Sequence, residues 1–252
     1  MTRILTYNIH RCVGTDRRLD VGRVADVIAA QRPDIVALQE VDVGCARTGG
    51  VDQAQAIAGR LGMAFRFHAA LKVEEELYGD AILTALPERL VRAGPLPGHP
   101  GLRRLEPRGA LWVEITIGDV RLQVLNTHLG LVPREQLIQA TALAGPHWLG
   151  GPDRRDPLIV LGDLNAGPRS AACRALPHDL RDATASPRGG RRLATFPSAV
   201  PLRQIDHLFA SADVIIEAIH TPRDAATRRA SDHLPLVADF TIATAMRGGR
   251  GS

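Results

Sequence analysis

Residues 158–165 read LIVLGDLN and mark a sharp change in the chain, from an apolar run of strand length to a polar turn. A glycine, an acid and an amide follow the run, with Leu164 between the last two. Gly, Asp and Asn favour turns because they accept unusual φ values and bond to nearby backbone groups. Taken alone, the stretch is therefore more typical of a turn than of an active site.

The composition of the 252-residue chain is that of a globular protein, with 45% apolar and 23% charged residues. No window approaches roughly 18 consecutive apolar residues, so we expect no transmembrane segment. The N-terminus leads straight into a strand-like segment without the apolar core of a signal peptide. Cys12, Cys45 and Cys173 fit neither a disulfide framework nor a CxxC zinc site. We therefore expect reduced thiols and a cytoplasmic protein.

Basic residues exceed acidic ones, giving a net charge of +4 and a pI near 9.5. Such a balance is compatible with nucleic-acid binding. However, Lys72 is the single lysine among 31 basic residues, and the arginines are scattered rather than gathered in one block. We favour a solvated, arginine-rich surface over a dedicated nucleic-acid face, and an anionic substrate fits both interpretations.

Apolar runs recur along the chain, and several end in Gly, Asp or Asn, as strands do. They predict strands over residues 4–9, 35–41, 65–71, 81–86, 111–117, 122–127, 158–161, 205–210, 214–220 and 234–242. Gly118 and Asp119 between two of these runs predict a tight hairpin turn.

Helical periodicity appears between some of the strands. It predicts a helix over 21–29 capped by Asp20, a second over 53–61 ended by Gly62, a third over 135–148, and a short one after Pro168. The third would bury Leu137, Ala140, Thr141, Ala144 and Trp148. Segments 94–109 and 184–192 are interpreted as surface loops. We expect one mixed α/β domain over residues 1–243 and a disordered tail over 244–252.

Polar side chains stand at the ends of several predicted strands instead of in the middle of loops. If these strand ends lie on one edge of the sheets, their carboxylates, amides and imidazoles meet in one pocket, held by rigid elements. The residues are Asn8, Glu40, His128, Asp163, Asn165, Asp206, His207, Asp232 and His233. Each alone is weak support for a site, but turns do not explain the whole pattern.

Six motifs around these residues, YNIH, ALQEVD, NTHLG, GDLNA, IDHLF and SDHLPLVAD, follow one another in this order. In this respect the chain resembles the endonuclease/exonuclease/phosphatase superfamily. That superfamily includes pancreatic deoxyribonuclease, exonuclease III-like abasic-site endonucleases, neutral sphingomyelinases and inositol-polyphosphate 5-phosphatases. The resemblance covers about residues 4–240. It implies a four-layer α/β sandwich of two packed mixed β-sheets flanked by helices, and divalent-metal-dependent hydrolysis of a phosphoester.

Three of the residues are candidate ligands for a hard cation. Mg²⁺ prefers oxygen ligands and needs only one or two protein carboxylates. Glu40 is the best candidate because a carboxylate at the inner end of an apolar strand is costly unless compensated. Asn8 offers an amide oxygen beside it, and Asp232 is a third donor. The resemblance implies the same three ligands for Mg²⁺, with Mn²⁺ as a substitute.

The remaining residues suit the attack of water on a phosphate. Asp163 is a candidate general base, and Asn165 would share its face if the strand stays extended. His233 is a candidate phosphate contact or proton donor, with Asp206 fixing its tautomer, a pair that the resemblance also implies. His128 matches the additional histidine of the deoxyribonuclease and phosphatase branches.

Other interpretations stay open for several of these residues. Asn8 alone is more typical of a turn, Glu40 alone could be a surface acid paired with an Arg, and His207 is more typical of a structural residue. A zinc site built from His10, His128 and His233 is a minor alternative, because acids and amides favour a hard cation.

The chain departs from the family pattern around residues 78–108. Asp80 stands where many relatives have Asn, and Tyr78 is a candidate pocket residue. Arg108 is either a phosphate clamp or an exposed loop charge. An acid that supports His128 would be one of four: Glu74, Glu75, Glu76 or Glu106.

The favoured function is therefore a metal-dependent phosphoesterase acting on a small-molecule or lipid-linked phosphodiester or phosphomonoester. A metal-dependent endo- or exonuclease acting on DNA or RNA is the alternative, although nine Phe, Trp and Tyr residues provide few stacking platforms. An inactive nucleic-acid-binding or scaffold protein is a lesser alternative, because every position of the pattern keeps a chemically competent residue. The sequence indicates no protein partner, and its loops leave the substrate unidentified.

Overall fold

The computed structural model describes residues 1–102, 104–185 and 193–243. The predicted tail at 244–252 and most of the predicted loop at 184–192 lie outside these residues. No helix in the described ranges is both long and apolar enough to span a membrane. The three cysteines are buried and free.

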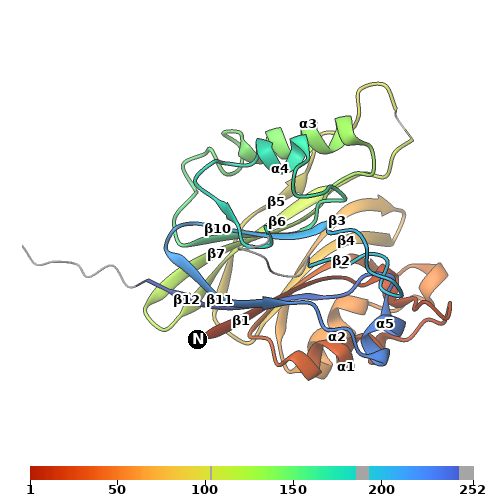
Figure 1. Cartoon of the computed structure of the whole chain (residues 1–252). Coiled ribbons are helices and arrows are strands. Elements are labelled where there is room, and N and C mark those ends of the chain that lie inside the picture. The colour runs from red at the N-terminus through yellow and green to blue at the C-terminus, as the bar shows by residue number, and fades with distance from the viewer. Residues whose placement is uncertain (103, 186–192, 244–252) are drawn as a thin grey trace, which may run out of the picture.

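Two six-stranded sheets pack face to face, as Figure 1 shows. The strands of the first are β1 (Thr2–Asn8), β2 (Ile35–Val43), β3 (Ala64–Val73), β4 (Glu76–Thr84), β11 (Val214–His220) and β12 (Leu236–Ile242), in the order β11-β12-β1-β2-β4-β3. The strands of the second are β5 (Glu88–Pro95), β6 (Gly109–Ile117), β7 (Val120–His128), β8 (Leu158–Asp163), β9 (Arg181–Asp182) and β10 (Asp206–Ala210), in the order β5-β6-β7-β8-β10-β9. Both sheets are mixed, with one parallel pair each, β1–β2 and β7–β8.

Helices cover the outer face of each sheet (Figure 1). On the first sheet these are α1 (Val21–Gln31), α2 (Gln53–Leu61) and α5 (Ala225–Ala230), and on the second α3 (Pro133–Ala144) and α4 (Ala171–Ala175). Single-turn helices η1 (His10–Cys12) and η2 (Ala46–Thr48) follow β1 and β2. One apolar core lies between the sheets and one under each helical layer. The expected four-layer α/β sandwich is therefore confirmed.

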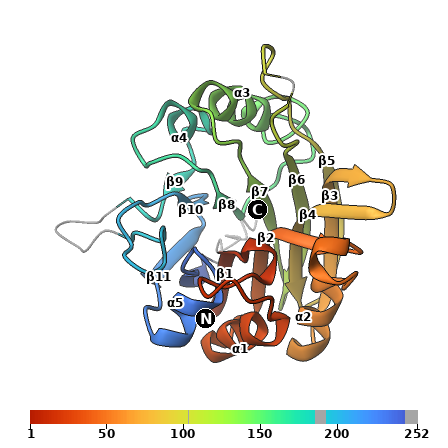
Figure 2. The ribbon, with the colours of Figure 1, turned by 90° about the vertical axis from the view of Figure 1, so that its right-hand side faces the viewer.

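The sandwich brings the ends of strands from both sheets together. Asn8 at the end of β1 donates a hydrogen bond to Asp163 at the end of β8. Figure 2, which views the right-hand side of Figure 1, looks onto this end of the molecule. The predicted polar strand ends therefore converge at one edge, as the sequence suggested.

Local sequence explains most of the element boundaries. Asp20 caps α1 by accepting from the Arg23 amide, and Gly62 ends α2 in a left-handed conformation, as predicted. Gly118, with φ of 58°, forms the two-residue hairpin between β6 and β7. Strand β5 was not predicted, because it is an edge strand without a continuous apolar run. It begins in the gap between the strand predicted over 81–86 and the loop predicted over 94–109.

The prediction for the third helix was wrong in its end and in part of its inner face, although Ala140 and Trp148 are buried as expected. Helix α3 spans Pro133–Ala144, so Trp148 is buried in the turns beyond it. Leu137 is 38% exposed, whereas Gln136 and Gln139 are buried and bond to the backbone of Gly130. The inner face is partly polar because it has to satisfy the loop that follows β7.

Candidate active site

A cleft of about 360 Å³ lies at the end of the sandwich where the polar strand ends converge. Its walls include residues from both sheets and from the loops between them. Among the predicted site residues, those that line it are Glu40, Tyr78, Arg108, His128, Asp163, Asn165, Asp232 and His233. Asn8 and Asp206 are buried directly behind this wall and bond to residues in it.

The segment LIVLGDLN forms the floor of the cleft through an irregular turn. Gly162 has φ of 138°, and a Cβ there would lie 1.9 Å from the Thr127 carbonyl oxygen, so no other residue fits. Asn165 follows the strand in a left-handed conformation, and its backbone N–H donates to Asp163 Oδ1 at 2.8 Å. The two side chains therefore reach one cleft through this turn, and not because the strand stays extended as expected.

A histidine lies between two acids in the cleft. His233 Nδ1 lies 2.9 Å from Asp206 Oδ2, and its Nε2 lies 3.6 Å from Asp163 Oδ2. Thr195 Oγ1 donates to the same oxygen of Asp206, and Phe196 packs on the His233 ring with centroids 4.9 Å apart. The Asp206 hydrogen bond and the Phe196 ring contact fix the orientation of the imidazole.

The acids and the histidine alter one another's protonation. Burial raises the pKa of Asp163, and the nearby Asp206 carboxylate raises it further against the opposing effect of His233. Burial acts to lower the pKa of His233, but Asp206 and Asp163 outweigh it and raise the pKa well above that of an ordinary histidine. These three residues also place ligand atoms within 4.8 Å of one another, so they could hold a metal ion.

Asn8 connects the two sheets at the site. Its Nδ2 donates to Glu40 Oε1 and to Asp163 Oδ2, both at 3.0 Å, while its Oδ1 accepts from the His10 amide at 3.0 Å. The amide nitrogen, and not the expected oxygen, therefore faces Glu40. Glu40 itself has φ of 58°, a left-handed conformation that costs a non-glycine residue roughly 1–2 kcal/mol.

Asp232 lines the cleft near His10, with its Oδ1 3.9 Å from His10 Nδ1. His10 uses that nitrogen on the Val13 carbonyl at 3.0 Å and has Arg11 against Nε2 at 2.9 Å. Within the described residues, the one cluster of His, Cys, Asp and Glu that could hold a metal contains neither His10 nor His128. The geometry therefore gives the zinc alternative no support.

The side chain that contacts His128 Nδ1 is Arg108, and not the acid that was expected to support this histidine. Arg108 Nη1 lies 3.1 Å from His128 Nδ1 and 2.6 Å from Glu106 Oε1. Of the four candidate acids, Glu106 contacts Arg108 and not His128. Glu76, at the start of β4, accepts from the backbone amide of Ala46 in η2. Sequence reasoning missed this arrangement because Arg108 comes from a loop 20 residues away.

Burial and the arginine together keep the His128 ring neutral. Burial lowers the pKa of His128 well below its usual value, and the Arg108 charge lowers it further, so the ring is neutral. A guanidinium only donates, so the proton of the neutral ring belongs on Nε2. That nitrogen faces the Asn165 amide at 3.0 Å and Asp163 Oδ2 at 3.5 Å. Asn165 cannot donate to a protonated Nε2, so the carboxylate of Asp163 is the acceptor compatible with the Arg108 contact.

Two further residues on β4 lie beside this group. Tyr78 lines the cleft and is 6% exposed, and burial raises its pKa far above that of a free tyrosine. Burial also raises the pKa of Asp80 to about 8, against the opposing charge of Arg108. Asp80 is therefore mostly protonated at neutral pH and resembles an asparagine in carrying no charge.

Two residues of the SDH and ATF segments support the site and were not predicted. Ser231 Oγ donates to the Asn8 carbonyl at 2.8 Å and accepts from the His233 amide at 3.2 Å. Thr195 holds Asp206 as described above. Only the serine had a sequence signal, its place directly before Asp232 in the motif.

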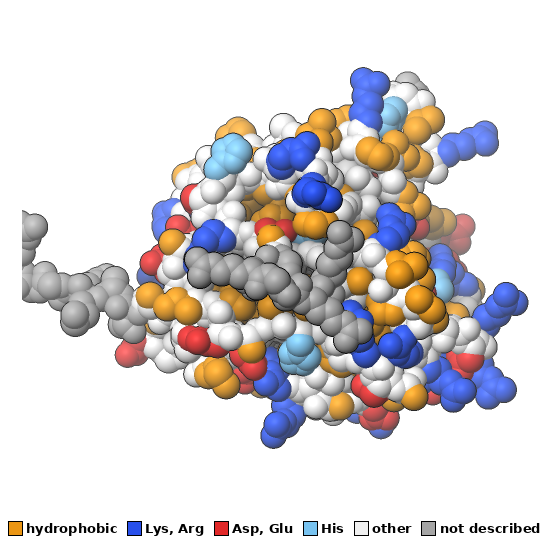
Figure 3. All heavy atoms as spheres, viewed as in Figure 1, with side chains coloured by type: hydrophobic (Ala, Val, Ile, Leu, Met, Phe, Trp, Pro, Cys, Tyr) orange, Lys and Arg blue, Asp and Glu red, His pale blue; other side chains and the backbone are white. Residues whose placement is uncertain are grey.

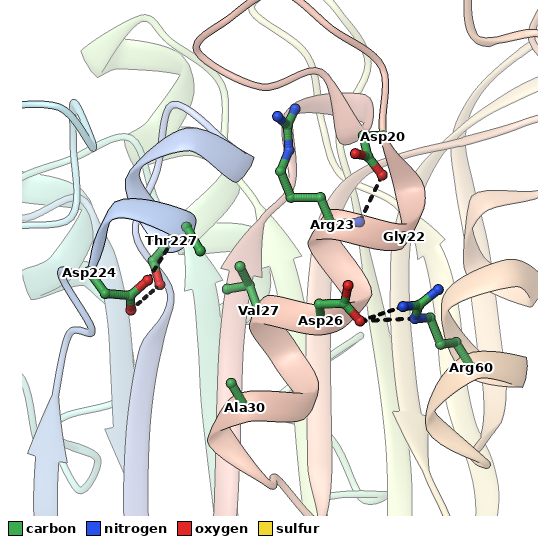
Figure 4. Close-up of a pocket in the computed structure, with 10 residues that line it drawn as sticks. Asp20, Gly22, Arg23, Asp26, Val27, Ala30, Arg60, Asp224 and Thr227 are labelled. Atoms are coloured by element: carbon green, nitrogen blue, oxygen red, sulfur yellow. Dashed lines mark hydrogen bonds and ion pairs between the residues drawn. The ribbon is translucent and has the colours of Figure 1, made fainter.

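A second pocket, of about 540 Å³, lies between α1, α2 and α5. Figure 4 shows Asp26 of this pocket paired with Arg60, and the distance between the charged atoms is 2.6 Å. Asp20 and Asp224 accept from the amides of Arg23 and Thr227 at the helix N-termini. Although larger, this pocket brings together none of the predicted site residues, so the smaller cleft is the candidate active site.

Comparisons with known proteins agree with this architecture. The chain is 24% identical to YbhP from Escherichia coli K12, a protein described as uncharacterized, over 95% of this chain and 96% of that one. It superimposes on an endonuclease/exonuclease/phosphatase from Beutenbergia cavernae with a TM-score of 0.74, 25% identity and coverage of 97% and 72%. A mannosyl-6-phosphatase from Bacteroides thetaiotaomicron has the same fold, with a TM-score of 0.73, 18% identity and coverage of 96% and 100%. The model of the Endonuclease/Exonuclease/phosphatase family matches residues 5–233, and the chain therefore belongs to that family.

Proposed function

We propose that this protein is a divalent-metal-dependent phosphoesterase that hydrolyses a phosphodiester or phosphomonoester through attack of an activated water. The family to which the chain belongs consists of hydrolases that act on phosphoester bonds. The observation that carries the proposal is the position of His233 between Asp163 and Asp206, in a cleft that also contains Glu40 and Asp232.

Asp163 is the proposed general base for the attacking water. Its raised pKa makes it a stronger base than an ordinary carboxylate, and its side chain lines the floor of the cleft. Asn165 lines the same cleft and is proposed to donate to a phosphate oxygen. The Nε2 proton of neutral His128, which faces Asp163 Oδ2 at 3.5 Å without substrate, is proposed to turn to a second phosphate oxygen when substrate binds. Donors fixed in advance toward the developing negative charge stabilise a transition state effectively.

His233 is the proposed proton donor. Its raised pKa keeps the ring protonated at neutral pH, so Nε2 carries a proton toward the cleft while Nδ1 remains bonded to Asp206. A cation at this position stabilises an anionic phosphate and can protonate a leaving oxygen. Asp206 acts through His233 and is therefore a positioning residue.

The donor set suits a hard divalent cation. Glu40 and Asp232 are partly exposed carboxylates in the cleft, and neither has an Arg or Lys partner in the described parts of the chain. We assign the ion, Mg²⁺ or Mn²⁺, to these two, with Asn8 as a third ligand when its amide presents the oxygen that now accepts from His10. When bound, the ion neutralises the phosphate charge and polarises the ester.

The Asp163–Asp206–His233 cluster is a less suitable place for Mg²⁺. Each ring nitrogen of His233 already faces a carboxylate, and nitrogen is a poor ligand for this ion. The two sites are distinguishable, because Glu40→Gln should weaken Mn²⁺ binding whereas His233→Ala should not.

Arg108 and Tyr78 are proposed as phosphate contacts at the edge of the cleft. The guanidinium is buried beside His128, and its Nε has no partner in the described residues. Arg108 can contact His128 and a phosphate at the same time, because the guanidinium has five N–H donors and uses only Nη1 on His128.

A nuclease is the second candidate function. Arg11, Arg108 and Arg203 line the cleft and could contact the phosphates that flank a scissile bond. However, Figure 3 shows Lys and Arg side chains spread over the side of the molecule seen in Figure 1 and mixed with acids, without one basic patch on that side. We therefore rank a small-molecule or lipid-linked phosphoester above DNA or RNA.

Hydrolysis of bis-p-nitrophenyl phosphate tests the proposal. EDTA should abolish the activity and added Mg²⁺ or Mn²⁺ should restore it, while Asp163→Asn should lower turnover at least about 100-fold. Activity that survives chelation would refute the metal assignment. A panel of plasmid DNA, abasic DNA, sphingomyelin, phosphoinositides, phosphatidylglycerol and sugar phosphates then ranks the substrates. Plasmid nicking at low enzyme concentration, abolished by Asp163→Asn, would favour the nuclease.

A further inference from the structure

Gln39 and Asn126 belong to the QE and NTH motifs, yet the proposed chemistry uses neither side chain. Both are fully buried between the two sheets, where apolar residues otherwise form the core. A buried amide has to find hydrogen-bond partners or destabilise the protein. Their partners therefore indicate what the two residues are for.

Strand β2 contains a β-bulge at Glu40. Leu38 pairs with Ala81 of β4, but Val41 pairs with Gly79, so Gln39 and Glu40 together oppose the single residue Asp80. Glu40 adopts φ of 58° within this bulge. Bulges of this kind redirect a side chain and leave local backbone groups without ladder partners. The bulge is what turns the Glu40 carboxylate toward Asn8 and the cleft.

Asn126, from the opposite sheet, caps the backbone beside this bulge. Its Nδ2 donates to the Leu38 carbonyl at 2.9 Å and to the Ala81 carbonyl at 3.0 Å, one on each strand. Gln39 Nε2 donates to Asn126 Oδ1 at 2.7 Å and lies 3.0 Å from Thr6 Oγ1 on β1. The hydrogen bonds of Gln39 and Asn126 thus join strands β1, β2 and β4 of the first sheet to β7 of the second.

We propose that Asn126 and Gln39 form an inter-sheet clamp that positions Glu40 for metal binding. The proposal rests on Glu40 being a metal ligand, as argued above. Asn126 lies two residues before His128 on the same strand, so the clamp also sets the distance between Glu40 on one sheet and His128 on the other. Both are positioning residues, because neither lines the cleft.

One feature of the clamp argues against a purely stabilising role. Gln39 Oε1 is buried and has no partner in the described residues. A half-satisfied amide is worse for stability than an apolar side chain of similar size. Gln39→Met removes this unpartnered oxygen but also leaves Asn126 Oδ1 without its donor, so we expect a lower melting temperature and judge the clamp by metal affinity, not by stability.

The test is Mn²⁺ affinity of the full chain, measured by isothermal titration calorimetry without substrate. Asn126→Leu and Gln39→Met should each weaken Mn²⁺ binding, by roughly 10-fold or more for Asn126→Leu, the usual cost of losing an outer-shell partner. Gln123→Leu is the matched control. Gln123 is a buried amide on the same strand, and it bonds to the backbone of Asp153 and Arg155 at the far end from the site. It should lower stability and leave Mn²⁺ affinity unchanged.

Each outcome has a defined meaning. Weaker Mn²⁺ binding in both clamp variants, but not in Gln123→Leu, supports the clamp. Wild-type affinity in Asn126→Leu, together with weak binding in Glu40→Gln, overturns the clamp and leaves the proposed function intact. If Asn126→Leu does not fold, the Mn²⁺ affinity of Gln39→Met decides between these two outcomes.

A metal-free measurement separates the clamp from the metal assignment. If Glu40→Gln binds Mn²⁺ normally, the metal assignment fails, and amide hydrogen exchange of the apo proteins tests the clamp alone. Exchange at residues 39–41 and 80–81 should then rise in the clamp variants relative to Gln123→Leu. Equal exchange in all three would overturn the clamp.

Discussion

Asp206 and His207 are neighbours on β10, and each forms half of a buried Asp–His pair, on opposite faces of the strand. Asp206 Oδ2 lies 2.9 Å from His233 Nδ1, and His207 Nδ1 lies 3.4 Å from Asp182 Oδ2. In both histidines burial acts to lower the pKa and the hydrogen-bonded or neighbouring groups outweigh it, so both pKa values are raised, that of His207 to about 10. By charge state alone, the two pairs look alike.

The second ring nitrogen distinguishes them. His233 Nε2 faces Asp163 and its ring lines the cleft. His207 Nε2 donates to the Ala166 carbonyl at 2.8 Å, and the residue is fully buried. A raised pKa therefore does not identify a catalytic histidine. What identifies it is a nitrogen that a substrate can reach, because only such a nitrogen can exchange a proton with the substrate.

The largest difference between the pairs should appear in turnover. His233→Ala should lower the hydrolysis of bis-p-nitrophenyl phosphate at least about 100-fold, the scale of lost acid–base catalysis. His207→Gln should keep turnover close to wild type. Steady-state kinetics of the two variants under one set of conditions makes the comparison. An equal loss in both would mean that the functional distinction between the pairs is wrong.

A smaller effect is expected from the acid of the cleft pair. Asp206→Asn keeps an oxygen that can accept from His233 Nδ1 but removes the negative charge that favours the protonated ring. The turnover number should fall less than in His233→Ala, with little change in Mn²⁺ affinity, because Asp206 does not contact the proposed ligands. Unchanged turnover would show that Asp206 has no positioning role.

The sequence predicted most of the fold because the signals were local. Strand-length apolar runs, the Asp20 cap and Gly62 are properties of short segments. Strand β5 was missed because, as an edge strand, it exposes Leu90 and Arg89 and lacks a core-like run. The inner face of helix α3 was partly mispredicted because its buried face carries glutamines that bond to the loop after β7. Apolar periodicity cannot indicate a buried face that is polar.

The site was predictable as a set of residues but not as a set of contacts. The motifs placed the carboxylates and imidazoles in one cleft, and the opposite directions of Asp206 and His207 followed from strand alternation. The Arg108 contact with His128, the orientation of the Asn8 amide and the bulge at Glu40 did not follow. Each depends on a loop conformation or a one-residue shift in register, which no sequence period records.

The smallest effect on turnover, and a clear effect on stability, is expected from the enclosed pair. Imidazolium His207 donates to Asp182 or Thr184 through Nδ1 and to Ala166 through Nε2, and the Cys173 sulfur lies 3.9 Å away. A hydrogen bond to a charged group contributes roughly 1.5–3 kcal/mol. His207→Gln should therefore lower Tm at pH 7 by several degrees, at about 2–4 °C per kcal/mol for a domain of this size.

That difference in Tm should depend on pH in a defined direction. In the unfolded chain His207 titrates near 6.5, whereas in the folded protein it titrates at about 10. Below pH 6.5 both states hold the proton and the stabilisation is complete. Between about 6.5 and 10 the folded state keeps a proton that the unfolded state has lost, so stability declines as pH rises. The Tm gap between wild type and His207→Gln, measured calorimetrically in EDTA, should therefore narrow from pH 6.5 to 10. A gap that stays constant over this range would mean that His207 is neutral when folded, and the likeness between the two Asp–His pairs would end there.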